Sequence, residues 1–305
     1  MNEPIVTGAA NQKMKENPGD RAVTVVCYLV VILFSACCLV PFILAVSASF
    51  TSEMALARNG YQFWPSQFST RAYTLLFRTN QIFQSYGVSI FVTVAGTALS
   101  LLATTLIAYP LSTGKLKYGS KINFFVYFTM LFSGGLVPSY MLISRYLGMK
   151  NSIWVLIIPI LINPWNMFLL RNFFSSIPAS LAESARIDGA NDIRILFQII
   201  LPVSTPALAT IGLFYALAYW NNWFQALLYI DTSSLKPLQA IIMEMLRNAD
   251  FMTQMAGQMG ISTADIPTTT SKMATAMVTI GPIVLVYPFV QKYFTSGIMV
   301  GSVKG

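Results

Sequence analysis

The chain has 305 residues, of which 55% are hydrophobic and only 10% are charged, and its mean hydropathy is +0.62. Soluble domains carry about 25% charged residues, so this composition indicates an integral membrane protein. Histidine is absent, which excludes histidine metal ligands, histidine general bases and histidine-containing catalytic triads. The net charge of +8 comes without a basic stripe, which argues against nucleic acid as a partner.

The cysteines and the lack of a nucleotide-binding motif exclude further functions for this chain. Cys27, Cys37 and Cys38 lie in one apolar run and are interpreted as packing residues, with no metal site and no disulfide. The Gly114–Lys115 pair lacks the upstream glycine and the following serine or threonine of a phosphate-binding loop. We therefore expect no catalytic residue, no metal and no cofactor on this chain, and any ATP hydrolysis must occur on another chain.

Membrane spans are expected where charged residues are missing, because a charge at mid-bilayer costs roughly 2.5–3.5 kcal/mol even on a lenient insertion scale. A helix of about 20 residues crosses the hydrocarbon core. Six windows are long enough, which predicts an all-α polytopic membrane protein with six transmembrane helices. The windows are 22–52, 79–114, 122–144, 151–170, 195–230 (with its span from about Thr205 to Trp223) and 273–291.

The two ends of the chain are predicted to be polar tails, residues 1–22 and 295–305, around one membrane domain of residues 23–294. Near the end of the first tail, Asn17, Pro18 and Gly19 are expected to break any helix. The apolar segment that follows is too long for the apolar region of a signal peptide, so we expect it to remain in the protein.

Residues 49–82, which connect the first two predicted spans, are expected to be external and contain NGYQFWP, residues 59–65. A turn followed by aromatic residues suits a membrane interface. In the second window, Gly96 and Ala103 are small enough to let a neighbouring helix approach closely.

The third and fourth windows contain helix breakers. Gly134, Gly135 and Pro138 predict a break or a re-entrant bend in the third, and Pro159 and Pro164 interrupt the fourth. Irregular backbone at membrane depth is tolerated where protein or a water-filled path covers it. Two interpretations stay open: these breaks line a translocation path, or they are kinks that only shape packing.

A polar insert, SLAESARIDGANDIRILFQIILP, occupies residues 180–202 between two apolar runs. Ser180 and Glu183 match an S-x-x-E capping box and predict the start of a short helix. Gly189 is placed to end that helix, and Asn191 is placed to cap a second one, which Pro202 ends or kinks.

The second short helix of this insert is predicted to present one apolar face, formed by Ile193, Phe197 and Ile200 at helical spacing. The local chemistry alone leaves an ordinary polar loop and a docking device equally open.

Residues 224–271, which follow the span ending at about Trp223, are expected to form a second external segment. Residues 238–249, LQAIIMEMLRNA, are predicted to form an amphipathic helix. Its apolar side either packs against the tops of the spans or contacts an external partner, since methionine-rich surfaces adapt to partners. The methionines concerned are Met243, Met245, Met252, Met255 and Met259.

The insert resembles the EAA motif, E-A-A-x3-G-x9-I-x-L-P, of the permease subunits of bacterial ABC importers. The matching residues are Glu183, Ala185, Gly189, Ile199, Leu201 and Pro202, and the one departure is Ser184 in place of the second alanine. In that family the segment is a cytoplasmic coupling helix that docks in a cleft on the ATP-hydrolysing subunit.

The resemblance extends over nearly the whole chain. It is similar to the carbohydrate uptake group of these permeases, of the LplC/YtcP oligosaccharide type related to the maltose permease MalG. The segments that carry this similarity are SFTSE (49–53), AYPLS (108–112), MLFSGGLVPSY (130–140), RNFFSSIP (171–178), YWNNWF (219–224) and the tail from residue 287 to residue 305.

The resemblance implies a MetI-like permease fold with six spans in the bacterial plasma membrane. The implied partners are ABC ATPase subunits that carry ATP and Mg, a second permease subunit in a heterodimer, an extracellular solute-binding protein, a sugar substrate and membrane lipid. Both termini would be cytoplasmic. The loop charges decide this only weakly, since residues 111–121 hold three lysines and residues 145–150 hold two basic residues.

Two groups of candidate site residues follow. Docking on the ATPase is assigned to the coupling segment, where Ala185 and Gly189 are expected to matter because they are small; its residues are Glu183, Ser184, Ala185, Asp188, Gly189 and Ala190. Gly297, Gly301 and Gly305 resemble tails that reach toward the ATPase.

The second group comprises amides and aromatics that suit the hydroxyls and ring faces of a sugar. These substrate-path candidates are Asn163, Asn166, Tyr219, Trp220, Asn221, Asn222 and Trp223. The alternative is that Trp and Tyr only reflect the preference of these residues for membrane interfaces.

Three other functions compete with this interpretation. An ion-coupled secondary transporter would usually place an ionisable residue inside the membrane, and the six windows contain none. A membrane enzyme would need a catalytic constellation at membrane depth, which the sequence does not offer. The chain could also be an ABC permease for a solute other than a sugar, and this alternative stays open because the EAA segment does not determine which substrate is transported.

Overall fold

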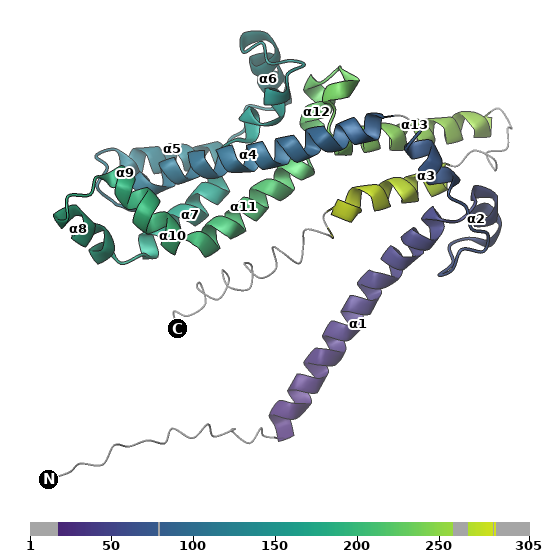
Figure 1. Ribbon diagram of the computed structural model, residues 1–305, viewed down its shortest axis with the longest axis horizontal. Helices are drawn as coiled ribbons and strands as arrows, with labels where there is room; N and C mark the ends of the chain where they lie inside the picture. Colours follow the sequence, from purple (N-terminus) through teal and green to yellow (C-terminus); the bar gives the residue numbers. More distant parts are fainter. Residues whose placement is uncertain (1–17, 79, 259–267, 283, 285–305) are drawn as a thin grey trace.

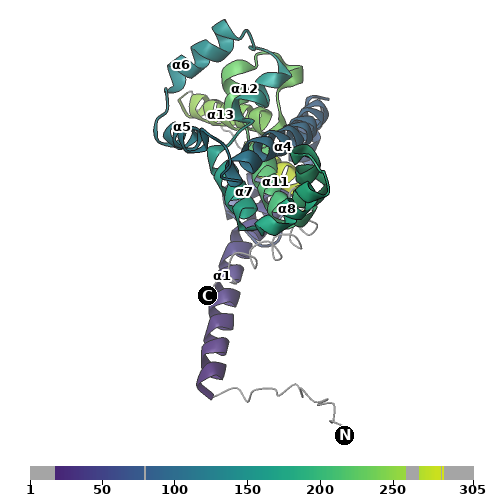
Figure 2. The same ribbon diagram turned by 90° about the vertical axis from the view of Figure 1, so that its left-hand side faces the viewer.

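The computed structural model describes residues 18–78, 80–258, 268–282 and 284 as a helical protein (Figures 1 and 2). The predicted polar tails, the tail glycines and Met259 lie largely or wholly outside these residues. The described helices and helical turns are α1 Pro18–Ser49, α2 Glu53–Asn59, α3 Arg71–Leu76, α4 Gln81–Ser112, α5 Gly119–Leu131, α6 Leu136–Met141, η1 Leu142–Tyr146, η2 Ile153–Leu156, η3 Ile158–Ile160, α7 Pro164–Ser176, α8 Ala179–Ile187, α9 Asp192–Ile195, η4 Leu196–Ile200, α10 Leu201–Val203, α11 Thr205–Trp220, α12 Phe224–Tyr229, η5 Ser233–Leu235 and α13 Leu238–Gln258, and residues 269–282 are also helical.

Most of the predicted spans are present. Two helices, residues 21–49 and 81–112, are each long and apolar enough to cross a membrane, and three bent helix pairs bring the number to five. The bends are 112° between α5 and residues 136–146, 51° before α7, and 85° between residues 192–203 and α11. The sixth window continues beyond the described residues, so the count of six stays a prediction. The chain is a multi-pass membrane protein, and its described residues are mostly helical.

The helix breakers act where they were expected. The 112° bend falls at Gly134 and Gly135, and Gly135 has a φ of +86° that favours glycine. In the fourth window, 3-10 turns precede α7, which begins at Pro164 with the side chain of Asn163 as its N-cap. The helix α7 runs past the window to Ser176, because Arg171 is accommodated by a hydrogen bond from its Nε to the Leu111 carbonyl at 3.2 Å.

The centre of the molecule is the packing of α4 against α11 and α7 (Figures 1 and 2). Gly96 makes the approach to α11 possible, since a Cβ on this residue would lie 2.7 Å from the Tyr219 ring. Two hydroxyl pairs join the same helices: Thr104 with Tyr215 at 2.7 Å and Ser100 with Tyr219 at 2.8 Å. The prediction that Gly96 permits a close helix contact is therefore confirmed.

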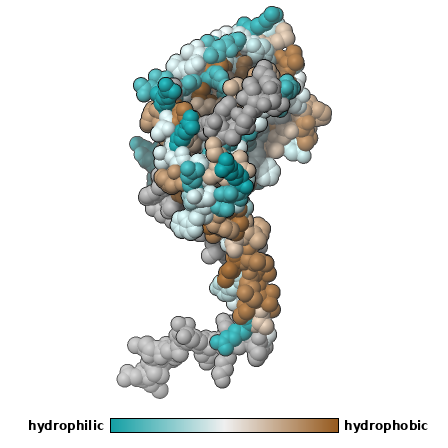
Figure 3. Space-filling model, turned by 90° about the vertical axis from the view of Figure 1, so that its right-hand side faces the viewer, coloured by the Kyte–Doolittle hydropathy of each residue, from teal (hydrophilic) through white to brown (hydrophobic). Residues whose placement is uncertain are grey.

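The first helix stands apart from this bundle. From Val23 to Ile43 its large apolar side chains are exposed, and Figure 3 shows it as a brown rod extending from the body of the molecule. Cys27, Cys37 and Cys38 are exposed on this helix and so do not pack within the described chain. Pro18 starts the helix instead of breaking it, because the first helical position has no N–H to lose to the ladder.

The end of the molecule that carries α2, α3 and α13 lies opposite the end that carries α8 and α9 (Figure 1). The amphipathic helix predicted for residues 238–249 is confirmed and continues to Gln258. Its side chains Leu238 and Ile242 are buried in a small core with Leu76 and Ala274, so this part of its apolar side packs on its own chain.

Glu53 connects α2 to the start of the helix over residues 269–282. Its carboxylate accepts hydrogen bonds from the backbone N–H groups of Thr269 and Thr270 at 2.8 and 2.9 Å, and from the hydroxyls of Thr268 and Thr270 at 3.2 and 2.7 Å. The carboxylate thus caps the start of the helix over residues 269–282 from a distant part of the chain. Burial raises the pKa of Glu53, but the hydrogen bonds from Thr270 and Thr269 outweigh burial and leave the pKa below its ordinary value of 4.5.

Candidate translocation cavity and coupling segment

The polar insert forms two short helices, α8 and α9, as expected, but the predicted capping box is wrong. The first helix begins at Ala179 with Pro178 as N-cap, and no side chain caps its start. Pro178 has the extended backbone of a flanking residue, with φ −56° and ψ 127°, so the helix starts two residues earlier than a capping box at Ser180 implies. Ser180 is therefore inside the helix, and Glu183 is an exposed residue on its surface.

The bend after α8 is a Schellman motif, as the position of Gly189 indicated. The N–H of Gly189 donates to the Arg186 carbonyl at 3.0 Å, and the N–H of Ala190 donates to the Ala185 carbonyl at 2.9 Å. Gly189 has a φ of +81°, which side-chain-bearing residues rarely adopt. The bend thus depends on a glycine conformation and on two backbone hydrogen bonds.

The second helix of the insert is capped as predicted. The Oδ1 atom of Asn191 accepts a hydrogen bond from the Arg194 N–H at 2.8 Å. Arg186 forms an ion pair with Asp192 at 2.8 Å, which connects the two helices across the bend. The hydrogen bond to Asp192 raises the pKa of the Arg186 guanidinium.

The exposed surface of this segment differs in part from the prediction. Glu183, Ser184, Asp188 and Gly189 are exposed, and Ala190 is half-buried. Ala185 was expected on the docking surface, but it is only 7% exposed and belongs to the central core. Its small size therefore serves packing within this chain.

Two apolar side chains on this segment were not among the candidates. Ile187 is 87% exposed and Ile193 is 70% exposed, one on each side of the bend. Single exposed apolar residues are common on protein surfaces, so these two side chains are additional candidates for contact with a partner and do not by themselves define a site. Their presence inside a polar insert was a signal available in the sequence.

The single apolar face predicted for Ile193, Phe197 and Ile200 is wrong. Ile193 and Phe197 are exposed, and the buried side chains are Ile195, Leu196 and Ile200. The reason is the π-helical turn η4 at residues 196–200, which changes the 3.6-residue period on which the prediction depended.

The segment leads directly into α11 through the 85° bend at Ser204. The Ser204 side chain is fully buried, and its hydroxyl donates to the Ile200 carbonyl at 2.7 Å. The coupling segment and α11 are thus joined by a hydrogen-bonded corner, and Pro202, where the kink was predicted, lies two residues before Ser204.

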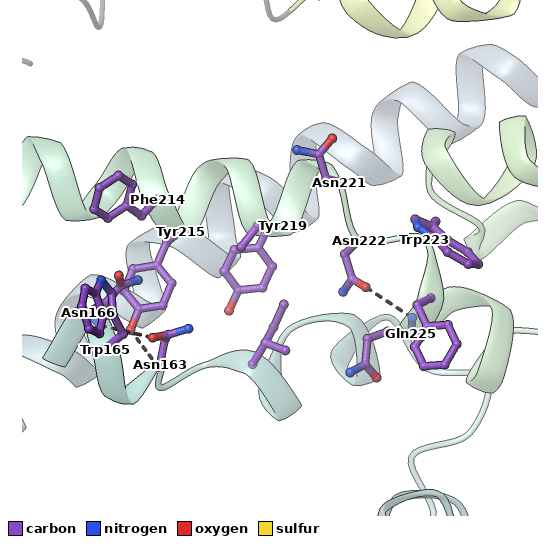
Figure 4. Close-up of a pocket in the computed structure, with 13 residues that line it drawn as sticks. Asn163, Trp165, Asn166, Phe214, Tyr215, Tyr219, Asn221, Asn222, Trp223 and Gln225 are labelled. Atoms are coloured by element: carbon purple, nitrogen blue, oxygen red, sulfur yellow. Dashed lines mark hydrogen bonds between the residues drawn. The ribbon is translucent and has the colours of Figure 1, made fainter. Parts of the chain in front are cut away.

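A cavity of about 680 Å³ lies between α11, α12 and the start of α7 (Figure 4). Its lining includes six of the seven predicted substrate-path residues: Asn163, Asn166, Tyr219, Asn221, Asn222 and Trp223. The breaks in the fourth window therefore do border a cavity. Among the lining residues that sequence analysis did not assign are Trp165, Tyr215 and Gln225, and the described lining carries no charged side chain.

Trp220 is the predicted residue that does not line this cavity. It packs instead against the small core of α3, α4 and α13. Adjacent residues of a helix point about 100° apart, so Tyr219 and Trp220 cannot both face one cavity from α11. Asn221 borders the cavity, but in Figure 4 its side chain points away, and its amide donates to the Leu217 carbonyl at 2.9 Å.

The tyrosines and the first asparagine of the lining are held by hydrogen bonds within the chain. The Tyr215 hydroxyl accepts from the Asn163 N–H at 3.0 Å, and the Tyr219 hydroxyl donates to the Ile157 carbonyl at 3.2 Å. The Oδ1 atom of Asn163 accepts from the Asn166 N–H at 3.2 Å. These groups give the cavity a fixed wall along α11 and the start of α7.

Comparison with known proteins shows that this chain is a transport permease. No protein-family model matches the chain. The polygalacturonan/rhamnogalacturonan transport system permease protein YtcP of Bacillus subtilis (strain 168) is 43% identical over 286 residues, which cover 94% of this chain and 99% of YtcP. The protein LplC of the same organism is 40% identical over 269 residues, which cover 88% of this chain and 90% of LplC.

A solved structure agrees with these relatives. A chain of the crystal structure of a bacterial ABC transporter involved in the import of the acidic polysaccharide alginate matches with a TM-score of 0.78 and 32% identity, covering 92% of this chain and 99% of that chain. The chain described here therefore belongs to the permease subunits of ABC importers for sugars. It is a transport subunit and not an enzyme.

Proposed function

We propose that this chain forms half of the translocation path of an ABC importer for an oligosaccharide. An extracellular solute-binding protein delivers the sugar, a second and different permease subunit supplies the other half, and ATP is hydrolysed with Mg on separate ATPase subunits. The chain has six spans in a MetI-like fold, lies in the bacterial plasma membrane and keeps both termini in the cytoplasm.

The observation that carries this proposal is the direct connection between the coupling segment and the cavity. The segment leads into the corner at Ser204, and the next helix, α11, starts at Thr205 and supplies Tyr215 and Tyr219 to the cavity wall. A capped, rigid segment displaced by a partner would move this helix as a unit. Alternating access needs such a connection between the driving subunit and the substrate path.

The docking surface proposed for the ATPase lies on the exposed side of α8 and α9. It combines Ile187 and Ile193 with the polar residues Glu183, Ser184 and Asp188. This end of the molecule lies opposite α2 and α13 (Figure 1). The arrangement is consistent with ATPase docking on the cytoplasmic side and with sugar delivery at the other side.

The cavity favours a sugar as the transported molecule. Aromatic side chains such as Trp223 and Trp165 offer faces for pyranose rings, and the amides of Asn222 and Gln225 offer partners for hydroxyls. The names of YtcP and of the alginate transporter also refer to polysaccharides.

Site-specific cross-linking tests the docking. In a chain whose Cys27, Cys37 and Cys38 are replaced by serine, I187C is alkylated with a maleimide that carries a benzophenone group. The native membranes are then irradiated, so that the activated ketone inserts into a C–H bond of a docked partner. The expected result is an adduct with an ATP-hydrolysing subunit, identified by mass spectrometry. The matched control is W64C, which is 84% exposed in the loop between α2 and α3 and should give no such adduct. In Figure 1, α2 and α3 lie at the end of the molecule opposite α8. Equal labelling from both positions, or none from I187C, would contradict the proposal.

A further inference from the structure

The turn between α4 and α5 carries a cluster of basic side chains without acidic partners. Lys115, Lys117 and Lys121 are all exposed, and none of them forms an ion pair with another described residue. The sequence contains no aspartate or glutamate between Glu53 and Glu183, so the flanking helices α4, α5 and α7 offer no carboxylate to the cluster. The turn therefore presents three uncompensated positive charges to its surroundings.

Tyr118 brings two of these charges to one place. The Nζ atoms of Lys117 and Lys121 each lie 5.6 Å from the centroid of the Tyr118 ring, within the range of a cation–π contact. The ring itself is 56% exposed. Tyrosine favours the membrane–water interface, and lysine side chains at the ends of spans extend to the level of the lipid headgroups. The cluster thus has the composition of a headgroup contact.

The helix that follows the cluster is exposed along its whole length. No residue of α5 is buried, and the helix forms one half of a candidate membrane span. Phe124, Phe128 and Phe132 form a row of exposed rings, with successive ring centroids 6.4 and 4.4 Å apart. Figure 2 shows α5 at the side of the bundle, outside α4, α7 and α11. The basic cluster therefore stands at one end of an exposed apolar track.

We propose that this turn binds the headgroup of an anionic phospholipid, whose acyl chain lies along α5. The phosphodiester accepts charge-assisted hydrogen bonds from the ammonium groups, and the exposed rings contact the chain. A zwitterionic lipid carries its own cation, which competes with the lysines, so the site selects lipids of net negative charge. An acidic protein surface would match the lysines but not the row of rings that starts one turn after Lys121.

The site lies near the coupling segment. The end of α4 is held beside α7 by the hydrogen bond from the Arg171 Nε to the Leu111 carbonyl at 3.2 Å, and α7 leads directly to α8. In the orientation proposed above, the bound lipid belongs to the cytoplasmic leaflet. The site concerns the surrounding bilayer and not the transported solute, so it goes beyond the proposed function and does not depend on it.

The test uses the full chain, purified with the subunits that accompany it and reconstituted in vesicles of phosphatidylcholine. The vesicles contain a trace of phosphatidylglycerol that carries a diazirine on an acyl chain. After irradiation, labelled peptides are identified and quantified by mass spectrometry, and the amount of each variant in the vesicles is measured in parallel. The test variant is K117Q/K121Q, and K117R/K121R keeps both charges. The matched control is R58Q/R71Q, which removes two exposed arginines from α2 and α3 at the opposite end (Figure 1).

We expect label on the peptide that covers residues 119–132, lowered in K117Q/K121Q by roughly fivefold for each lysine removed. The label should be unchanged in K117R/K121R and R58Q/R71Q. Unlabelled phosphatidylglycerol should compete for the site, whereas phosphatidylethanolamine and inorganic phosphate should not.

Equal label in K117Q/K121Q and R58Q/R71Q would overturn the lipid site. So would displacement by phosphatidylethanolamine or inorganic phosphate as effective as that by phosphatidylglycerol. Loss of an accompanying subunit from K117Q/K121Q with unchanged label would assign the lysines to an acidic protein surface and also overturn the proposal.

Discussion

The bend at Gly189 offers the sharpest test of the coupling segment. With a φ of +81°, Gly189 occupies a backbone conformation that costs a residue with a side chain roughly 1–2 kcal/mol, and more for a β-branched residue. A side chain at this position would not clash with its surroundings, because a Cβ there would have no neighbour within 4 Å in this chain. Gly189→Val therefore strains the backbone without creating a clash inside the described protein.

The backbone strain that valine would introduce at Gly189 is comparable to the free energy of the two hydrogen bonds that stabilise the bend. The two Schellman hydrogen bonds, at 3.0 and 2.9 Å, contribute about 1 kcal/mol each. A penalty of about 2 kcal/mol, a change of roughly thirtyfold in the equilibrium, thus brings the bent and unbent forms to similar populations. Gly189→Asn is the matched control, since asparagine tolerates the left-handed region best among residues with a side chain.

The assay is co-purification of the ATPase subunit with each variant, combined with uptake of the transported sugar. We expect the valine variant to insert normally but to retain less ATPase and to transport several-fold more slowly, with the asparagine variant close to the wild type. The reasoning is refuted if valine behaves as the wild type. It is also refuted if asparagine fails as badly as valine, because bulk at the docking surface, and not the backbone, would then be the cause.

Two further predictions concern the stability of the described fold. Glu53→Gln should lower the melting temperature in detergent at pH 7 by removing a charged acceptor from the start of the helix over residues 269–282, a loss of about 1–2 kcal/mol after allowance for partial exposure. Since the pKa of Glu53 is lowered in the fold, its contribution is complete above the ordinary value of 4.5 and is lost as pH falls below it, so the two melting temperatures should converge in acid; a gap that persists there would contradict this account. Gly96→Ala would place a Cβ 2.7 Å from the Tyr219 ring and should destabilise by about 1–3 kcal/mol, measured by thermal unfolding. Gly87→Ala, on the same helix with open space around it, should not, and equal effects of the two changes would show that the contact is not responsible.

Much of the architecture could be predicted because it depends on strong local signals. Charge-free windows marked the helices, and the glycines and prolines of the third and fourth windows marked the breaks, since these residues set backbone geometry wherever they occur. Gly189 and Asn191 were correctly assigned for the same reason. The capping box failed at Ser180 because Pro178 competes for the start of the same helix.

The residues that were missed depend on packing that short-range patterns do not encode. The π-helical turn at residues 196–200 rotates the apolar face of the insert, so Ile195 and Leu196 are buried in place of Ile193 and Phe197. Gln225 reaches the cavity only because the chain turns between α11 and α12. The exposure of the first helix likewise follows from how the chain packs and not from its composition.

The central claim is that this permease works only with an ATPase docked on its coupling segment. The most direct measurement is to extract the tagged chain from its host in mild detergent, identify the subunits that accompany it by mass spectrometry, and measure uptake by the complex in vesicles with and without internal ATP. The account predicts an ATP-hydrolysing subunit and a second multi-pass permease in fixed ratio to this chain, with uptake only when ATP is present. A chain that is recovered alone, well folded and able to drive uptake without ATP, would contradict it.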